Sequence, residues 1–177
     1  MTRNFPQLAT AYIALGSNLG NREQHLLAAI AALRRLGDVG AVSSFYETEA
    51  VGEVPQPDFL NAVVELTTHL EPEELLRALL QIEQEHGRDR SVAPPKGPRT
   101  LDLDLLSYGS RVMRTPSLTL PHPALAERRF VLEPLAEIAP QWRHPVDGKT
   151  AAQLLSELIG GNDRTLAAVR RISAHEK

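Results

Sequence analysis

The sequence contains no cysteine. This absence excludes disulfides, thiolate zinc sites and cysteine nucleophiles, and it fits a reducing compartment. No apolar run approaches the roughly 18 to 20 residues that a helix needs to cross a bilayer. The first ten residues, MTRNFPQLAT, have no apolar signal core. We therefore expect residues 1–10 to be a flexible lead-in, and the protein to be cytoplasmic and to make no membrane contact.

Aromatic residues are also scarce, at 5% of the chain, and the formal net charge is −3. A sheet that binds RNA needs exposed aromatic side chains interleaved with basic ones. Few aromatics and a negative net charge therefore argue against a nucleic-acid partner. The apolar content of 42% and charged content of 23% are ordinary for a globular protein.

Several common catalytic motifs are missing as well. The chain has no GxGxxG fingerprint, no HxxxH or HxH pair and no GxSxG elbow. DGKT at 147–150 resembles the end of a phosphate-binding P-loop, but the motif requires a glycine where Arg143 stands. Zinc chemistry and serine-based acyl transfer therefore have no support, and any nucleotide site must be built in another way.

Hydrophobic periodicity and turn residues predict alternating strands and helices. A length of 177 residues suits one domain, which we place at 11–160, followed by a polar tail at 161–177. The element order predicts an α+β, ferredoxin-like β-α-β-β-α-β sandwich with extra C-terminal helices. We expect strands at 11–16, 41–51, 59–70 and 97–106, and helices at 21–36, 72–87, within 115–140 and at 150–159.

The stretch GPRTLDLDLL at 97–106 carries two carboxylates, Asp102 and Asp104, inside an apolar strand. Strand side chains alternate, so the leucines should share one face and the carboxylates the other, with β-carbons about 7 Å apart. The alternative is a strand with one wet face. Neighbouring carboxylates raise each other's pKa unless a cation lies between them. Magnesium binds one or two carboxylates together with water and phosphate oxygens, so one or two such ions would fit here.

Basic residues precede this strand and recur after it. A solvated basic loop is the simpler reading of the first group, but it leads directly into the paired carboxylates. Arginine grips phosphate oxygens in a bidentate fork, so cations beside a divalent-metal site suit a polyphosphate ligand and phosphoryl-type transfer. The first group is Arg88, Arg90, Lys96 and Arg99, and the second is Thr119, His122, Arg128 and Arg129.

With these residues in view, the sequence resembles the 6-hydroxymethyl-7,8-dihydropterin pyrophosphokinase family. The similarity runs from Ala11 to Leu155 and is carried by GPRTLDLDLL, YIALGSNLG, SSFYET, QPDFLNAVV and LPHPALAERRFVLEPLAEIAP. The resemblance implies a ferredoxin-like fold and transfer of the terminal pyrophosphoryl group of ATP to the hydroxymethyl group of a reduced pterin. AMP is then released. The resemblance also implies two Mg²⁺ ions and a place in folate biosynthesis. ATP and the pterin would be the partners, and we expect the chain to be a monomer.

The resemblance also implies roles for individual residues. Asp102 and Asp104 would hold both magnesium ions between themselves and the triphosphate. Arg88 and Arg99 would be catalytic, as parts of a mobile loop that closes over ATP. The residues implied in ATP binding are Glu83, Arg88, Arg90, Arg99, Thr119, His122, Arg128 and the backbone near Leu105.

The pterin would lie between two aromatic side chains, with an amide reading its polar edge. This arrangement makes physical sense because two rings can sandwich a flat heterocycle and an amide offers both a donor and an acceptor. Ordinary core packing is the alternative role for the two phenylalanines. The residues implied in pterin binding are Thr48, Val51, Gly52, Phe59, Asn61 and Phe130.

The chain departs from the family pattern at a few positions. Many relatives carry Arg-Trp before GPR, where this chain has Pro95 and Lys96, and Ser117 and Pro123 stand where relatives carry an arginine and an aromatic. We therefore expect loop closure and the ATP contacts to depart from the family pattern more than the metal site does. The rival from another class is a non-enzymatic ferredoxin-like module that binds a nucleotide or RNA.

Overall fold

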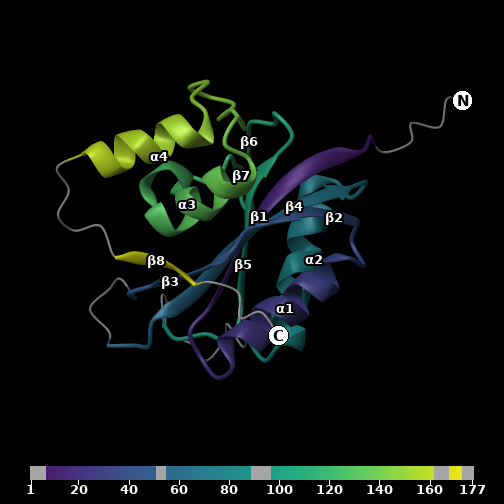
Figure 1. The fold of residues 1–177 in the computed structure, drawn as a ribbon. Coiled ribbons are helices and arrows are strands. Elements are labelled where there is room, and N and C mark those ends of the chain that lie inside the picture. Colours follow the sequence, from purple (N-terminus) through teal and green to yellow (C-terminus); the bar gives the residue numbers. More distant parts are fainter. Residues whose placement is uncertain (1–6, 51–54, 89–96, 162–167, 173–177) are drawn as a thin grey trace, which may run out of the picture.

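The computed structural model describes residues 7–50, 55–88, 97–161 and 168–172. A central β-sheet carries helices on both of its faces (Figure 1). The main sheet contains β1 (Ala9–Ser17), β2 (Asp38–Val42), β3 (Phe45–Thr48), β4 (Phe59–Thr68), β5 (Asp102–Tyr108) and β8 (Val169–Ile172). The other elements are α1 (Arg22–Leu33), α2 (Pro72–Glu85), the hairpin β6 (Met113–Arg114) and β7 (Thr119–Leu120), η1 (Leu125–Glu127), α3 (Arg129–Ile138) and α4 (Ala151–Gly160).

The sheet topology confirms the α+β, ferredoxin-like prediction. Strands lie in the order β5-β1-β4-β3-β8, with β2 also pairing with β4, and the pairs are antiparallel. The order β1, α1, β2 and β3, β4, α2, β5 reproduces the expected β-α-β-β-α-β plan. The strand predicted at 41–51 is divided, because β2 ends at Val42 and β3 begins at Phe45.

The sheet separates two hydrophobic cores. On one face, β1, β4 and β5 pack against α1 and α2, with Leu15, Leu26 and Leu79 fully buried. On the other face, Leu106 of β5 and Leu132 of α3 belong to a second buried cluster, which also includes residues of α4. Each fully buried leucine contributes about 1.5 to 3 kcal/mol of transfer free energy, so both helical layers are anchored to the sheet. The C-terminal helices are therefore a covering layer for the second face.

Residues at the helix ends account for where the helices begin. The Asn21 side chain accepts a hydrogen bond from the Gln24 amide, as expected of an N-cap, and Pro72 opens α2. Helix α1 ends at Leu33 rather than Leu36. Gly37 instead permits a close backbone approach, since a β-carbon there would lie 2.2 Å from the Thr67 carbonyl oxygen. None of the helices in the described part of the chain is long and apolar enough to span a membrane.

The strand β8 was not expected from the sequence, which placed residues 161–177 in a polar tail. Val169–Ile172 pair with β3 across its full length, from Thr48 with Val169 to Phe45 with Ile172. Ile172 is partly buried against the first core, whereas both arginines between the strand ends are exposed. The pattern V-R-R-I has no two-residue alternation, and this explains why hydrophobicity did not reveal the strand. The first strand also begins at Ala9, within the expected lead-in.

An acidic residue fastens β8 and α1 to β3. Glu47 forms ion pairs with Arg170 and with Arg22, the latter at 2.7 Å. The hydrogen bonds from Arg170 and then from Arg22 hold the pKa of Glu47 below its ordinary value of 4.5. One ionised carboxylate on β3 therefore links this strand to β8 and to α1.

Acidification should weaken this junction. A carboxyl whose pKa is lowered by folding stabilises the native state above its unfolded pKa, and this stability is lost as pH falls through the folded pKa. We expect the free energy of unfolding to fall between pH 5 and more acidic values, and to fall less steeply in Glu47→Gln. Urea unfolding at several pH values measures both slopes; equal slopes would contradict the assignment.

Candidate active site

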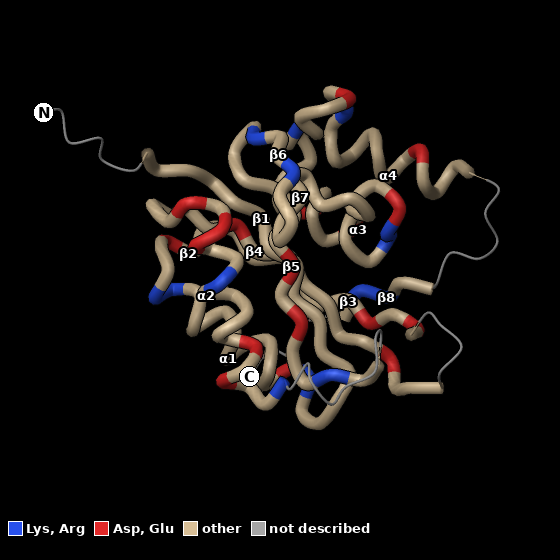
Figure 2. The backbone as a smooth tube through the Cα atoms, turned by 180° about the vertical axis from the view of Figure 1, so that it is seen from behind, with Lys and Arg blue, Asp and Glu red and all other residues tan. Residues whose placement is uncertain are grey.

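The two carboxylates of β5 project from one face of the sheet. Leu101, Leu103 and Leu105 pack into the first core, while Asp102 and Asp104 alternate with them on the opposite face. Their neighbours on β1 are small, with Gly16 opposite Asp102 and Ala14 opposite Asp104. Figure 2 shows acidic positions in red along β5 near the centre of the molecule.

The expectation that every leucine of this strand shares one face is wrong at Leu106. The register between β1 and β5 shifts between Tyr12 and Ile13, so Ile13 pairs with Leu105 whereas Tyr12 pairs with Ser107. Leu106 lies on the face that carries the carboxylates, as simple alternation after Leu105 requires, and packs into the second core. The bulge acts after Leu106, because it brings Tyr108 rather than Ser107 back to the first core.

Asp102 is held by two arginines from the segments that lead into β5. Arg88 forms an ion pair with one oxygen of Asp102, and the Arg99 guanidinium lies 3.4 Å from the other. Arg88 also contacts Glu83 at 2.7 Å, and Glu83 accepts a hydrogen bond of 2.8 Å from the Leu103 amide. Glu83 is 1% exposed and belongs to α2. The helix thus places Arg88 at the carboxylate strand.

Asp104 lies between cationic or titratable groups from the following loop. Burial, and then the charge of Asp102, raise the pKa of Asp104, while His122, Arg128 and Arg99 oppose that rise. The Arg128 guanidinium is 3.7 Å from an Asp104 carboxylate oxygen. Asp104 is therefore a partly buried carboxyl beside a second carboxylate, with arginines close to both.

His122 enters the site in a defined orientation. Its backbone amide donates to the Leu106 carbonyl at 2.8 Å, and its Nδ1 accepts from the Ala124 amide at 3.1 Å. In the neutral ring this leaves the proton on Nε2. Burial lowers the pKa of His122, against the raising effect of Asp104. The neutral imidazole can therefore donate one hydrogen bond to a ligand.

The donor set fits magnesium better than zinc or calcium. Within the described ranges, no group of three His, Cys, Asp or Glu residues could hold a metal ion together. Asp102 and Asp104 would thus supply carboxylate oxygens alone, leaving the remaining positions to water or phosphate, which is the ligand set that magnesium accepts. A bound cation would favour the ionised form of Asp104, whose pKa is raised by burial and by the charge of Asp102.

A second group of predicted residues lies beside Asp102 on the same face. Gly16 stands between Asn61 on β4 and Asp102 on β5, and the Phe59 ring is also within reach of it. The Asn61 amide nitrogen donates to the Thr48 hydroxyl at 2.8 Å. Both Asn61 and Thr48 are buried. The amide therefore has a fixed orientation next to the carboxylates.

Both predicted aromatic residues are partly buried and lie against an arginine of the site. The Arg99 guanidinium is 5.3 Å from the Phe59 ring centroid, and the Arg128 guanidinium is 5.7 Å from that of Phe130. Phe130 also packs against the second core. Phe59 of β4 and Phe130 of α3 thus each make a cation–π contact with an arginine beside the carboxylates.

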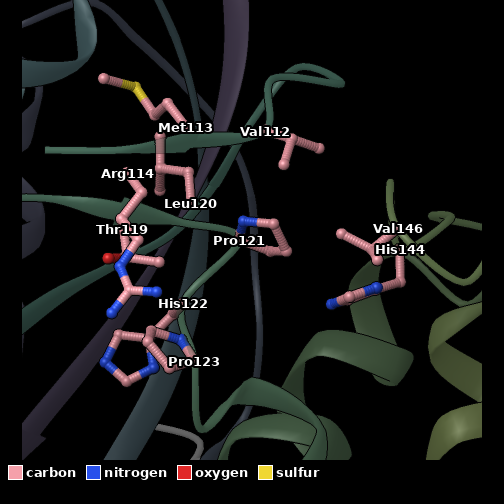
Figure 3. Close-up of a pocket in the computed structure, with 10 residues that line it drawn as sticks. All are labelled: Val112, Met113, Arg114, Thr119, Leu120, Pro121, His122, Pro123, His144 and Val146. Atoms are coloured by element: carbon pink, nitrogen blue, oxygen red, sulfur yellow. The ribbon is translucent and has the colours of Figure 1, made fainter.

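Thr119 and His122 line a cavity of about 460 Å³. Figure 3 shows the β6–β7 hairpin and the loop after it on one side of this cavity, with His144 and Val146 on the other. The size is within the range of small-molecule sites. Leu105 does not line it and its side chain is buried in the first core, so only its backbone could reach a ligand. Of the other predicted residues, Val51, Gly52 and Arg90 lie outside the described ranges, as do Pro95 and Lys96.

Sequence reasoning missed Asn18, which ties three segments together at the site. Its side chain accepts from the Arg99 amide at 2.8 Å and donates to the Gln56 side chain and the Pro57 carbonyl. Its own amide donates to the Arg99 carbonyl at 3.1 Å. Asn18 is 1% exposed. The polar turn GSNLGN directly after a buried strand was the available signal.

Replacing Asn18 by alanine should affect both stability and turnover. The change leaves the Arg99 amide without its side-chain acceptor, at a cost of about 1 to 3 kcal/mol in the free energy of unfolding. It also frees the segment that carries Arg99. Asn21→Ala is the matched control: it removes an exposed helix cap, which costs about 1 kcal/mol, and should leave turnover unchanged. Equal turnover in both variants would contradict the role of Asn18.

These features define a class of protein before any comparison is made. An antiparallel α+β domain presents two carboxylates on one strand, with arginines from three segments directed at them. Such a set suits magnesium-assisted transfer of phosphoryl-type groups from a polyphosphate.

The comparisons with known proteins narrow this class to one family. Residues 12–140 match the model of 7,8-dihydro-6-hydroxymethylpterin-pyrophosphokinase (HPPK), and the chain belongs to this family. It is 47% identical over 158 residues to the 2-amino-4-hydroxy-6-hydroxymethyldihydropteridine pyrophosphokinase of Synechocystis sp., covering 88% of this chain and 80% of the relative. The Bacillus subtilis protein of the same name is 51% identical over 133 residues, covering 74% of this chain and 78% of that protein.

Solved structures with low sequence identity share the fold. The wild-type Plasmodium falciparum HPPK-DHPS crystallised with pteroate aligns with a TM-score of 0.69 at 15% identity. The alignment covers 87% of this chain and 43% of that chain. This chain therefore spans less than half the length of that protein and resembles one part of its fold.

Proposed function

We propose that this chain transfers the pyrophosphoryl group of ATP to the hydroxymethyl group of 6-hydroxymethyl-7,8-dihydropterin in folate biosynthesis. The products are the pterin diphosphate and AMP. The observation that carries the proposal is the position of Asp102 and Asp104 on one sheet face beside Arg88 and Arg99, in a chain of the HPPK family. The names of the bacterial relatives point to the same activity.

Asp102 and Asp104 would hold the two Mg²⁺ ions that we expect, because their oxygens share one face of β5. When bound, magnesium offsets the triphosphate charge and lowers the pKa of an attacking hydroxyl. The protein's own contribution is to hold the strand that carries both carboxylates. β5 pairs with β1, and its Leu103 amide donates a hydrogen bond to Glu83 of α2. A strand held in this way fixes the positions of both carboxylates.

The arginines around Asp102 would exchange partners when ATP binds. Arg88 and Arg99 now neutralise Asp102, and the same guanidinium groups suit phosphate oxygens. Their positive charge would then stabilise the charge that develops on the transferred group. The further residues proposed to contact ATP are Glu83, Arg90, Thr119, His122, Arg128 and the backbone of Leu105.

The pterin would bind beside Gly16, where Asn61 reads its polar edge. The Asn61 nitrogen donates to Thr48, so its oxygen remains the natural acceptor for a ring N–H group. Phe59 and Phe130 would hold the flat ring, with Val51 and Gly52 completing the site. The hydroxyl would then attack the β-phosphorus in line. Holding two substrates in this geometry can supply about 7 to 11 kcal/mol of the barrier reduction.

We further propose that the chain works as a cytoplasmic monomer whose catalytic domain spans 11–160, without nucleic acid. The absence of cysteine supports the compartment, and the net charge of −3 argues against nucleic acid. The strand β8 adds a segment beyond that domain.

Calorimetric titrations separate this function from that of a nucleotide- or RNA-binding module. A non-hydrolysable ATP analogue should bind at least about tenfold more tightly with Mg²⁺ than without it, and its presence should strengthen pterin binding. A simple binding module has no reason to couple the three. Analogue affinity that is indifferent to both Mg²⁺ and pterin would overturn the proposed function.

A further inference from the structure

The strand β8 lies outside residues 12–140, which match the family model, yet it joins the main sheet. In Figure 1 it runs beside β3 and below α3. The pairing is antiparallel, with Val169 opposite Thr48 and Ile172 opposite Phe45. Without β8, β3 would be the edge of the sheet on this side. An edge strand has unpaired backbone groups and opens more readily than an interior one.

The side chains of β8 extend this pairing toward the segment before Phe59. Arg170 forms an ion pair with Glu47, and the basic strand lies beside acidic positions at β3 in Figure 2. Glu47 also binds Arg22, which donates to the Asp58 carbonyl at 2.8 Å. Asp58 directly precedes Phe59 in the chain. The contacts therefore run from β8 through β3 and α1 to the start of β4.

The other arginine of β8 connects β3 to α3. Arg171 donates to the Ser44 hydroxyl at 2.8 Å and pairs with Glu137 at 2.9 Å. Glu137 also accepts from the Ser44 hydroxyl at 2.7 Å and from the Tyr46 hydroxyl at 2.8 Å. Burial opposes ionisation of Glu137, but the hydrogen bonds from Ser44 and Tyr46 prevail and hold its pKa low. The helix α3 carries Phe130 near its start.

Thr48 is the point at which this network meets the proposed pterin site. It is 3% exposed, lies opposite Val169 of β8, and accepts the hydrogen bond that orients the Asn61 amide. A shift of β3 would release the Asn61 nitrogen and let the amide rotate. The oxygen that faces Gly16 would then no longer be fixed.

We propose that β8 is a positioning strand for the pterin side of the active site, which holds β3 so that Thr48 fixes the orientation of Asn61. This inference rests on the proposed function. Nothing in β8 touches Asp102 or Asp104 among the described contacts, so its effect falls on pterin recognition rather than on ATP binding. A site that is ordered before the ligand arrives avoids the entropy cost of ordering on binding.

The test uses the full chain with Arg170→Pro and Arg171→Pro combined. Two adjacent prolines remove a ladder hydrogen bond whichever amide faces β3, and they remove both charges. We expect Kd and KM for the pterin to rise about tenfold while those for ATP change less than about twofold. Amide hydrogen exchange in 45–48 should accelerate. The double variant Arg170→Lys, Arg171→Lys keeps the backbone amides and both charges, and should hold pterin affinity within about twofold of wild type, because both arginines are exposed and their detailed geometry contributes little.

A second pair of changes covers the case in which the proline variant does not fold. Arg170→Ala with Arg171→Ala keeps every backbone amide and should weaken pterin binding about threefold, again without affecting ATP. Faster exchange in 45–48 with unchanged pterin affinity would overturn the inference, and so would equal losses for ATP and pterin. Failure of the wild-type chain to bind pterin would instead contradict the proposed function, and the inference that rests on it.

Discussion

The double variant Asp102→Asn, Asp104→Asn is expected to fold and to lose turnover by about 10³-fold or more. The amides keep the size of the carboxylates but cannot hold a divalent ion between the strand and a triphosphate. Stability should be largely kept, because relief of the repulsion between two like charges opposes the loss of the Arg99 and Arg128 contacts, and Arg88 retains Glu83 as its partner. Turnover and urea unfolding measured on the same preparations test both effects.

Asp38→Asn provides the control for this variant. Asp38 is an exposed aspartate on β2, a strand of the same sheet, so its substitution should change neither quantity. A loss of turnover without a loss of stability makes the prediction specific. Normal turnover by the double variant would remove the basis for the metal assignment. A loss of activity that merely followed a loss of folding would show that these carboxylates serve the fold.

Arg99→Ala should lower kcat by about 10²- to 10³-fold while changing the free energy of unfolding by less than about 1 kcal/mol. Arg99 lies 3.4 Å from Asp102 and over the Phe59 ring, so it stands between the proposed metal and pterin positions. Its guanidinium lies 3.4 Å from Asp102, beyond ordinary hydrogen-bond distance, so this contact contributes little to stability. Steady-state kinetics and denaturant unfolding measure the two effects.

Arg111→Ala is a closely matched control for Arg99→Ala. Arg111 likewise has one ion pair, at 2.8 Å to Glu71, and one aromatic partner, Tyr108 at 5.4 Å, but it lies at the other end of β5. Its removal should leave kcat unchanged. Arg99→Lys should recover only part of the activity, because an ammonium cannot bind phosphate in a bidentate fork. Equal kcat in Arg99→Ala and Arg111→Ala would contradict a role for Arg99 in the reaction.

Local patterns in the sequence were enough to predict the ferredoxin-like core. The alternation of Leu103 and Asp104 predicted a two-faced strand, and Asn21 predicted the start of a helix. The sequence did not reveal the bulge that brings Tyr108 back to the first core, because a register shift depends on the partner strand. It also did not reveal β8, which is held by pairing with β3 and by ion pairs rather than by an apolar face.

In the site, too, contacts between residues close in the sequence were predictable, and contacts between distant segments were not. Arg99 and Asp102 are three residues apart, so their association was predictable from the motif. The approach of Arg128 to Asp104 joins β5 to a distant loop. The sequence marked Arg128 as part of a basic group but did not pair it with Asp104. Asn18 was missed because its importance depends on three segments meeting around one buried amide. Such residues can be recognised only when their hydrogen-bond partners are known.

The most direct test of the account is the identity of the products formed from ATP and 6-hydroxymethyl-7,8-dihydropterin. Phosphorus NMR and chromatography of the reaction should show AMP and the pterin diphosphate in equal amounts, and only when Mg²⁺ is present. Attack at the β-phosphorus requires this outcome, since the bond that breaks leaves the α-phosphate on the nucleoside. Formation of ADP with a pterin monophosphate, or no product from a folded chain, would contradict the account.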